Sequence, residues 1–159
     1  MRDSVPRSPV VEAVRFRPVQ EKDLESVFAI ETASFSDPWS IRNFREVMSV
    51  EQAIFLVAEQ DEGVSGYIIA MHVADEAEVL NIAVLPGRRG RGLGDQLLRA
   101  MLLMLREKNV KSVFLEVRES NVAARSLYER QGFAQVSKRK KYYRNPVEDA
   151  LILRVEIKG

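Results

Sequence analysis

The stretch Gly87–Gly94, GRRGRGLG, places four glycines and three arginines between two segments that should both be regular structure. The apolar run NIAVLP (81–86) precedes it and predicts a strand, and DQLLRAMLLMLREK (95–108) follows it and predicts a long helix. Glycine weakens both kinds of element, so this density of glycine needs a reason in the backbone itself. A glycine-rich turn at a helix start gathers several N–H groups at the positive end of the helix dipole. Such a turn would suit a pyrophosphate.

Two common phosphate-binding motifs do not fit this turn. A P-loop requires a lysine followed by serine or threonine, but Leu93 and Gly94 stand at those places. The dinucleotide-binding motif requires a third glycine where the chain has Asp95. Two interpretations remain. The turn is either a general anion site with the three arginines at its rim, or a plain strand-to-helix turn whose arginines face water.

Apolar periodicity divides the rest of the chain into strands and helices. Strands are predicted at 14–19, 53–60, 67–74, 79–84, 110–120 and 150–157, with 53–60 and 67–74 forming a hairpin. Helices are predicted at 24–35, 41–48, 95–108 and 121–133, with caps at Asp23, at Ser40, and at Ser120 or Asn121. We therefore predict a single α+β domain over residues 14–159, built on a mixed, mostly antiparallel sheet flanked by helices. A flexible arm over residues 1–13 should precede it.

Composition excludes several kinds of chemistry. The 159 residues include no cysteine and one histidine, His72, so disulfides, thiolate sites and histidine metal clusters are excluded, and we expect no metal. The net charge of +1 predicts no general attraction to nucleic acid or membranes. The basic run KRKKYYR (138–144) supports nucleic-acid binding only weakly, and we expect no such partner. The first residues lack the apolar core of a signal peptide, so we expect a cytoplasmic protein.

The turn and its surroundings resemble one enzyme family. NIAVLP followed by R-R-G-x-G-L-G resembles the acetyl-CoA signature of the GNAT N-acetyltransferase superfamily, and LEVRESNVAARSLYERQGF (115–133) resembles the second half of that domain. The resemblance runs from about Val14 to Ile157. FSDPWS (35–40) and KYYRNPVEDALIL (141–153) are most similar to the ribosomal-protein-alanine N-acetyltransferases (RimI type) within the superfamily. The chain departs from the family in a longer N-terminal arm and in Arg88, where an aromatic residue often stands.

The resemblance implies where acetyl-CoA binds. In this fold two strands splay apart, and the backbone of the strand carrying Ile82, Ala83 and Val84 would bond the cofactor. An ordinary buried strand would have the same composition. The remaining cofactor residues implied by the signature are Arg89, Gly90, Arg91, Gly92, Leu93, Gly94 and Asp95, together with Asn121, which could equally cap its helix.

The resemblance also implies the reacting residues. Glu116 lies in VFLEV, where alternation places it opposite the apolar side chains and leaves a solvated face as the alternative. The resemblance makes Glu116 the general base that deprotonates the amine. It makes Tyr128 the residue that protonates the leaving thiolate, although that residue alone would suggest packing. Trp39, Tyr142 and Tyr143 are candidates for contact with the acceptor.

The leading functional hypothesis is transfer of acetyl from acetyl-CoA to the α-amino group of a protein, specifically the N-terminal alanine of a ribosomal protein. A GNAT enzyme that acetylates a lysine side chain or a small amine is the first alternative. A non-catalytic acyl-CoA-binding domain is the second, and it does not account for having Glu116 and Tyr128 together.

Overall fold

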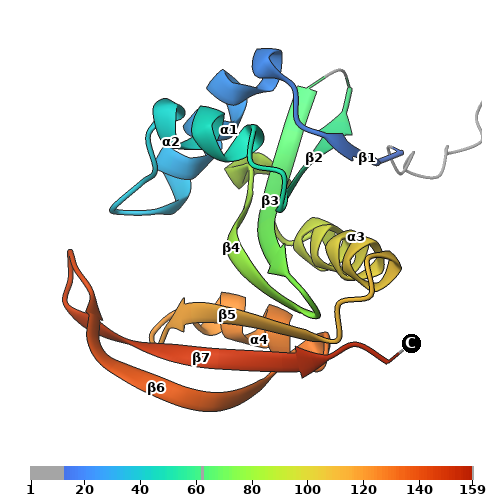
Figure 1. The fold of residues 1–159 in the computed structure, drawn as a ribbon. Coiled ribbons are helices and arrows are strands. Elements are labelled where there is room, and N and C mark those ends of the chain that lie inside the picture. The colour runs from blue at the N-terminus through green and yellow to red at the C-terminus, as the bar shows by residue number, and fades with distance from the viewer. Residues whose placement is uncertain (1–12, 62, 159) are drawn as a thin grey trace, which may run out of the picture.

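The described residues form seven strands in one sheet, with the order β1-β2-β3-β4-β5-β7-β6 (Figure 1). The computed structural model describes residues 13–61 and 63–158. Its strands are β1 (Arg15–Pro18), β2 (Ala53–Gln60), β3 (Gly63–Val73), β4 (Glu76–Val84), β5 (Ser112–Arg118), β6 (Ala134–Tyr143) and β7 (Glu148–Glu156). Only β4 and β5 pair in parallel, so the predicted mixed, mostly antiparallel sheet is confirmed. The predicted arm lies, except for Ala13, outside the described residues.

Four α-helices flank the sheet in the described part of the chain: α1 (Leu24–Ser34), α2 (Ile41–Met48), α3 (Leu93–Glu107) and α4 (Val122–Arg130). Short 3-10 turns cover Glu21–Asp23 and Pro86–Arg88. Ser40 caps α2 as predicted, and Asn121 caps α4 by accepting from the Ala124 N–H. The longest of these helices, α3, has 15 residues, and no helix among the described residues is long and apolar enough to cross a membrane.

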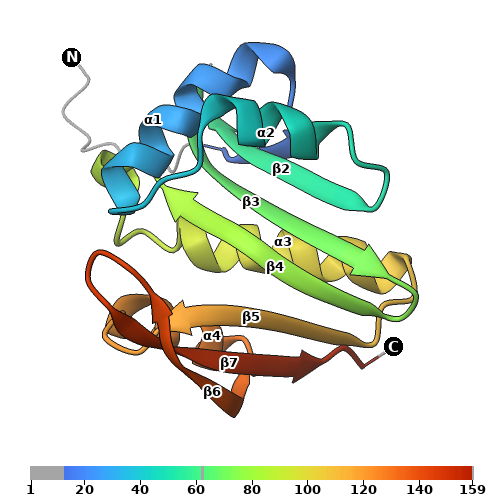
Figure 2. The same ribbon diagram turned by 60° about the vertical axis from the view of Figure 1, so that its left-hand side comes forward.

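Both faces of the central strands are buried, each against a different pair of helices. In β2 the side chains of Ile54, Leu56 and Ala58 belong to the core beneath α3 and α4. The intervening Phe55 and Val57 belong to the core beneath α1 and α2. This arrangement explains why the central strands read as continuous apolar runs instead of alternating ones. Figure 2 shows α1 and α2 lying over the part of the sheet that contains β2–β4.

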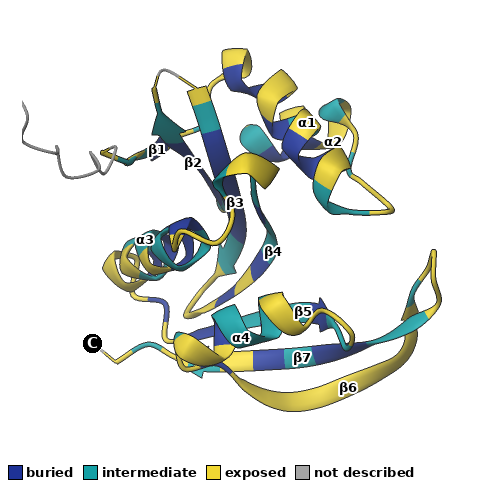
Figure 3. Ribbon diagram, turned by 180° about the vertical axis from the view of Figure 1, so that it is seen from behind, coloured by how far each residue is buried: buried dark blue, intermediate teal, exposed yellow. Residues whose placement is uncertain are grey.

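The structure corrects several predicted boundaries. The helix predicted from Asp95 begins at Leu93, because Gly92 takes the cap position with φ 82°. The strands predicted from 67 and 79 begin at Gly63 and Glu76. No strand was predicted where β6 lies, and β6 is exposed along almost its whole length (Figure 3). Its side chains add nothing to the core, so no apolar pattern marks it, and its backbone pairing to β7 holds it in the sheet.

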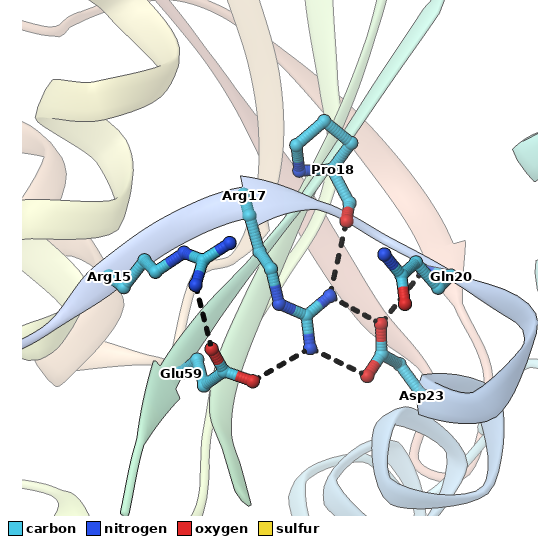
Figure 4. A network of polar contacts seen from close by, with 6 residues as sticks. All are labelled: Arg15, Arg17, Pro18, Gln20, Asp23 and Glu59. Atoms are coloured by element: carbon cyan, nitrogen blue, oxygen red, sulfur yellow. Dashed lines mark hydrogen bonds and ion pairs between the residues drawn. The ribbon is translucent and has the colours of Figure 1, made fainter. Parts of the chain in front are cut away.

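Asp23 precedes α1 as predicted, but its carboxylate does not cap that helix. Instead it accepts two hydrogen bonds from Arg17, at 2.7 and 2.9 Å, and a third from the Gln20 N–H at 2.8 Å (Figure 4). Arg17 also bonds Glu59 at 3.1 Å, so β1, β2 and the start of α1 are joined through one guanidinium. Arg17 and Asp23 are both buried. The Arg17 guanidinium holds the pKa of Asp23 below its usual value.

We expect Asp23→Ala to lower the free energy of unfolding by roughly 3 kcal/mol at pH 7, since it leaves Arg17 buried with Glu59 as its one ionic partner among the residues that the structure describes. The pKa of Asp23 is depressed in the folded state, so its contribution is fully present above the unfolded pKa of about 3.9 and is lost below it. The difference between variant and wild type should therefore shrink as the pH falls below about 4. Urea unfolding at pH 7 and pH 3 measures both effects. The control is Glu21→Ala, which breaks the exposed pair with Arg45 and should cost under about 1 kcal/mol.

Candidate functional site

A cleft opens where β4 and β5 separate. Their pairing ends at Val79 and Leu115, although β4 continues to Val84 and β5 to Arg118 (Figure 2). The register between β3 and β4 shifts at the same point, because Ile69 pairs with Asn81 and Ala70 with Val79. Leu80 is thus an extra residue, and such a bulge bends the strand that carries it. The cleft beyond has a volume of about 1410 Å³ and extends from the glycine-rich turn to the loop between β6 and β7.

Beyond Val79, the edge of β4 that faces this cleft is not paired with another strand among the described residues. The Leu85 N–H donates to the carbonyl of Ser65, a residue of β3, at 2.8 Å. Peptide groups alternate in direction along a strand, so those of Ala83 also face β3, and those of Ile82 and Val84 face the cleft. The three residues were predicted together, but only two of them present backbone groups to the opening.

The glycine-rich turn closes one end of the cleft. Gly90 and Gly92 have φ values of 78° and 82°, a region that glycine enters without steric cost. A Cβ atom on either would meet no other atom within 4 Å, so both glycines border open space. Gly92 caps α3 without a side-chain hydrogen bond, so no capping side chain satisfies the first N–H groups of that helix. Leu93, Gly94 and Asp95 supply these groups, and all three line the cleft.

The charged residues of the turn are mostly engaged with the protein itself. The Arg89 guanidinium donates to the Val84 carbonyl at 3.0 Å and to the Ser34 hydroxyl at 2.8 Å. Arg91 is exposed and is not among the residues that line the cleft. The Asp95 carboxylate pairs with Arg130 at 3.0 Å, which lowers the pKa of Asp95 and neutralises a negative charge beside the expected anion site. Arg89 and Asp95 therefore brace the turn from both sides.

Glu116 lies on β5, on the sheet face opposite α3 and α4. Its neighbours Leu115 and Val117 are buried in the core beneath those helices, as the alternation predicted. The Glu116 side chain is 19% exposed and lines the cleft, with the Arg139 guanidinium 3.6 Å from its Oε1. A hydrogen bond to Glu116 raises the pKa of Tyr142, and burial together with the charge of Glu116 raises that of Tyr143 to about 12.

Tyr128 reaches the same cleft from the other side of the sheet. It lies on α4, is buried, and packs against Phe133 with ring centroids 5.8 Å apart. Burial raises the pKa of its phenol, so the hydroxyl keeps its proton well above neutral pH. That hydroxyl makes no hydrogen bond to another part of residues 13–61 and 63–158, which leaves it able to donate to a ligand. Asn121, at the start of the same helix, both caps it and lines the cleft.

Two loops that line the cleft meet each other through a hydrogen bond. The Ser36 hydroxyl, between α1 and α2, donates to the Asn145 carbonyl, between β6 and β7, at 2.7 Å. Arg118 holds the second loop through the carbonyls of Arg144 and Pro146, at 2.7 and 2.9 Å. Trp39, Tyr142 and Tyr143 line the cleft beneath this bridge.

Sequence reasoning missed a buried polar cluster beside the cleft. Glu31 on α1 is only 1% exposed and accepts hydrogen bonds from Tyr67, Asn81 and the Trp39 N–H. A signal was present, since Glu31 follows Leu24 and Val27 at the spacing of the buried helix face. The bridge between Ser36 and Asn145 left no sequence signal, because its partners lie 109 residues apart.

A sheet that opens between two parallel strands onto a glycine-rich helix start, with a carboxylate and a phenol at the opening, is the arrangement expected of an N-acetyltransferase. The chain belongs to the Acetyltransferase (GNAT) family, whose model matches residues 24–133. The family resemblance that the sequence predicted is thereby confirmed.

Named relatives are similar over most of their length. The ribosomal protein bS18-alanine N-acetyltransferase of Haemophilus influenzae is 38% identical over 128 residues, which cover 80% of this chain and 86% of the relative. The Escherichia coli protein of the same name is 34% identical over 141 residues, covering 87% and 95%. The crystal structure of a ribosomal-protein alanine N-acetyltransferase from Escherichia coli matches with a TM-score of 0.86 and 32% identity, covering 92% of this chain and 96% of that one.

Proposed function

We propose that this protein transfers the acetyl group of acetyl-CoA to the α-amino group of a protein N-terminus, specifically the N-terminal alanine of a ribosomal protein of the bS18 type. The bridge of Ser36 and Asn145 over the cleft carries this proposal, because it favours a polypeptide that enters by its end. The names of the relatives support the choice of acceptor. With a ribosomal protein as the acceptor, we expect the reaction to take place in the cytoplasm.

The residues around the turn fit the parts of acetyl-CoA. The N–H groups of Leu93, Gly94 and Asp95 suit a pyrophosphate, since a helix start favours an anion and the glycines leave room for it. The cleft-facing peptide groups of Ile82 and Val84 suit the amides of pantetheine, which would lie along β4 like an added strand. The Val84 carbonyl already accepts from Arg89, so we assign Arg89 to holding this edge in place. Bound acetyl-CoA supplies the thioester that the amine attacks.

Glu116 and Tyr128 suit the two proton transfers. An α-amino group has a pKa near 8, so at neutral pH most of it is protonated and a base is useful. Glu116 lies on the face where the two bridged loops meet, and we assign it to taking that proton, directly or through one water. Tyr128 lies on the face of α4, and we assign its hydroxyl to protonating the departing thiolate. The two groups approach one cleft from opposite sides of the sheet, so proton removal and proton delivery are spatially separated.

We expect a peptide that begins with a free alanine to be acetylated with a kcat/KM roughly 100-fold above that of the same peptide with a blocked N-terminus and an internal lysine. The reason is that only a chain end can pass beneath the bridge and bring its amine to Glu116. Acetyl-CoA turnover against the two peptides and a small amine measures this. Faster reaction of the lysine peptide or of the small amine would contradict the acceptor assignment. Binding of acetyl-CoA without any turnover would favour a non-catalytic acyl-CoA-binding domain.

A further inference from the structure

The carboxylate of Glu31 is buried without a charged partner among the described residues. Its three hydrogen-bond donors are all neutral. The Tyr67 hydroxyl and the Asn81 side-chain amide, the latter at 2.7 Å, bond Oε1, and the Trp39 backbone N–H bonds Oε2 at 2.8 Å. Burial and the neighbouring Glu31 raise the pKa of Tyr67, which keeps it protonated as a donor. A carboxylate buried in this way is costly, and an apolar side chain would suit the core beneath α1 better.

The donors belong to two parts of the site. Asn81 directly follows the bulge at Leu80, so it lies where β4 leaves β5 and the cleft begins. Trp39 belongs to the loop between α1 and α2 that also carries Ser36 of the bridge, and its ring packs 5.3 Å from that of Phe44. Both residues line the cleft. One carboxylate thus connects the edge that should hold acetyl-CoA with the loop that should hold the acceptor.

We propose that Glu31 is a positioning residue that fixes the loop between α1 and α2, and with it the acceptor, relative to the opening between β4 and β5. This inference rests on the proposed function, since it takes this loop as the acceptor's binding surface. In this role Glu31 acts because its side chain is long enough to hydrogen-bond Asn81 on β4 and Trp39 in the loop at the same time. Its charge is not needed for this. It does not touch the reacting atoms.

Two conservative variants distinguish an effect of the length of the Glu31 side chain from an effect of its charge. Glu31→Gln loses the charge but can keep all three contacts, because its oxygen accepts from Trp39 while its amide donates to the Tyr67 oxygen and to a flipped Asn81. Glu31→Asp keeps the charge but is one methylene too short to reach both parts of the site. We expect Glu31→Asp to raise the KM for the acceptor peptide about tenfold, as the loss of one or two hydrogen bonds implies. We expect kcat and the Kd for acetyl-CoA to stay within about threefold, and Glu31→Gln to resemble the wild type in all three.

The same two substitutions at Glu25, which is exposed on the same helix, are the matched control and should change none of these values. A wild-type KM for Glu31→Asp would overturn the proposal. A KM for Glu31→Gln raised as far as that for Glu31→Asp would also overturn it, since Glu31→Gln can keep the three contacts and loses only the charge.

Amide hydrogen exchange of the wild-type protein gives a test that needs neither a folded variant nor a substrate. The Trp39 N–H should exchange much more slowly than the Asp37 N–H of the same loop, because it donates to a buried carboxylate. Equal exchange would overturn the positioning role. Absence of turnover with every peptide would instead contradict the proposed function, and the exchange result would still stand.

Discussion

Replacing Glu116 with glutamine is expected to lower kcat for an alanine peptide by 10²–10⁴-fold at pH 7, the usual range for loss of a general base. Acetyl-CoA should bind the variant normally, because the groups assigned to the cofactor lie on β4 and at the start of α3. The rate should recover in part between pH 7 and pH 9, as the amine, with a pKa near 8, loses its proton without assistance. Steady-state rates across this pH range, with acetyl-CoA affinity measured by calorimetry, check both statements.

Glu129→Gln is the matched control for this experiment, since Glu129 is an exposed glutamate on α4 and should leave the rate unchanged. A wild-type rate for Glu116→Gln would reduce Glu116 to a partner of Arg139 and Tyr142. A loss of rate that did not diminish at high pH would show that Glu116 acts in some way other than deprotonating the amine.

Replacing Gly92 with valine is expected to weaken acetyl-CoA binding roughly 100-fold, which corresponds to the loss of one or two charge-assisted hydrogen bonds. Gly92 has φ 82° and borders open space at the start of α3, so a branched side chain would occupy the place predicted for the pyrophosphate. Arg91→Ala should have a much smaller effect, because Arg91 does not line the cleft. Calorimetric titration of the folded variants with acetyl-CoA gives the comparison.

A side chain at a positive φ also strains the backbone, so the stability of the variant must be measured as well. Gly132→Ala is the control for this strain, since Gly132 has φ 93° and lies just after α4, away from the cleft. It should lose stability and keep its affinity for acetyl-CoA. Unchanged affinity in a folded Gly92→Val protein would exclude the turn as the pyrophosphate site.

Local sequence patterns predicted most of the strands and helices. They could not predict contacts between segments that lie far apart in the sequence. The apolar run of β2 and the glycine-rich turn could be placed because their signals lie within a few residues. The strand β6 was missed because its side chains are exposed, and only its pairing to β7 marks it as a strand. The backbone groups of Ala83 face β3 and not the cleft, because β4 stays paired with β3 beyond the bulge and separates from β5. No sequence pattern shows which of the two neighbouring strands β4 stays paired with.

The same distinction between local patterns and distant contacts applies to the candidate site. The motif that resembles the family marked Glu116 and Tyr128, and the structure brings both into one cleft. Arg89 was predicted as positive charge for a ligand, but the structure engages its guanidinium with Val84 and Ser34, which are 5 and 55 residues away. The role of Glu31 depends on Tyr67 and Asn81, which lie on strands 36 and 50 residues further along the chain. Such contacts follow from the topology of the sheet and not from spacing along the chain.

The separation of β4 from β5 also bears on self-association. Unpaired strand edges can pair with other molecules and promote aggregation. The two outer strands of the sheet have features that disfavour such pairing. The strand β1 has only four residues and ends in Pro18, and β6 carries exposed lysines at 138, 140 and 141. The edge of β4 that faces the cleft carries no such feature, but residues of α1, α4 and β5 line the same cleft. Because these elements surround the edge, we expect it to admit a thin, flexible ligand more readily than a strand of a second protein chain, which would leave one edge open for binding without promoting aggregation.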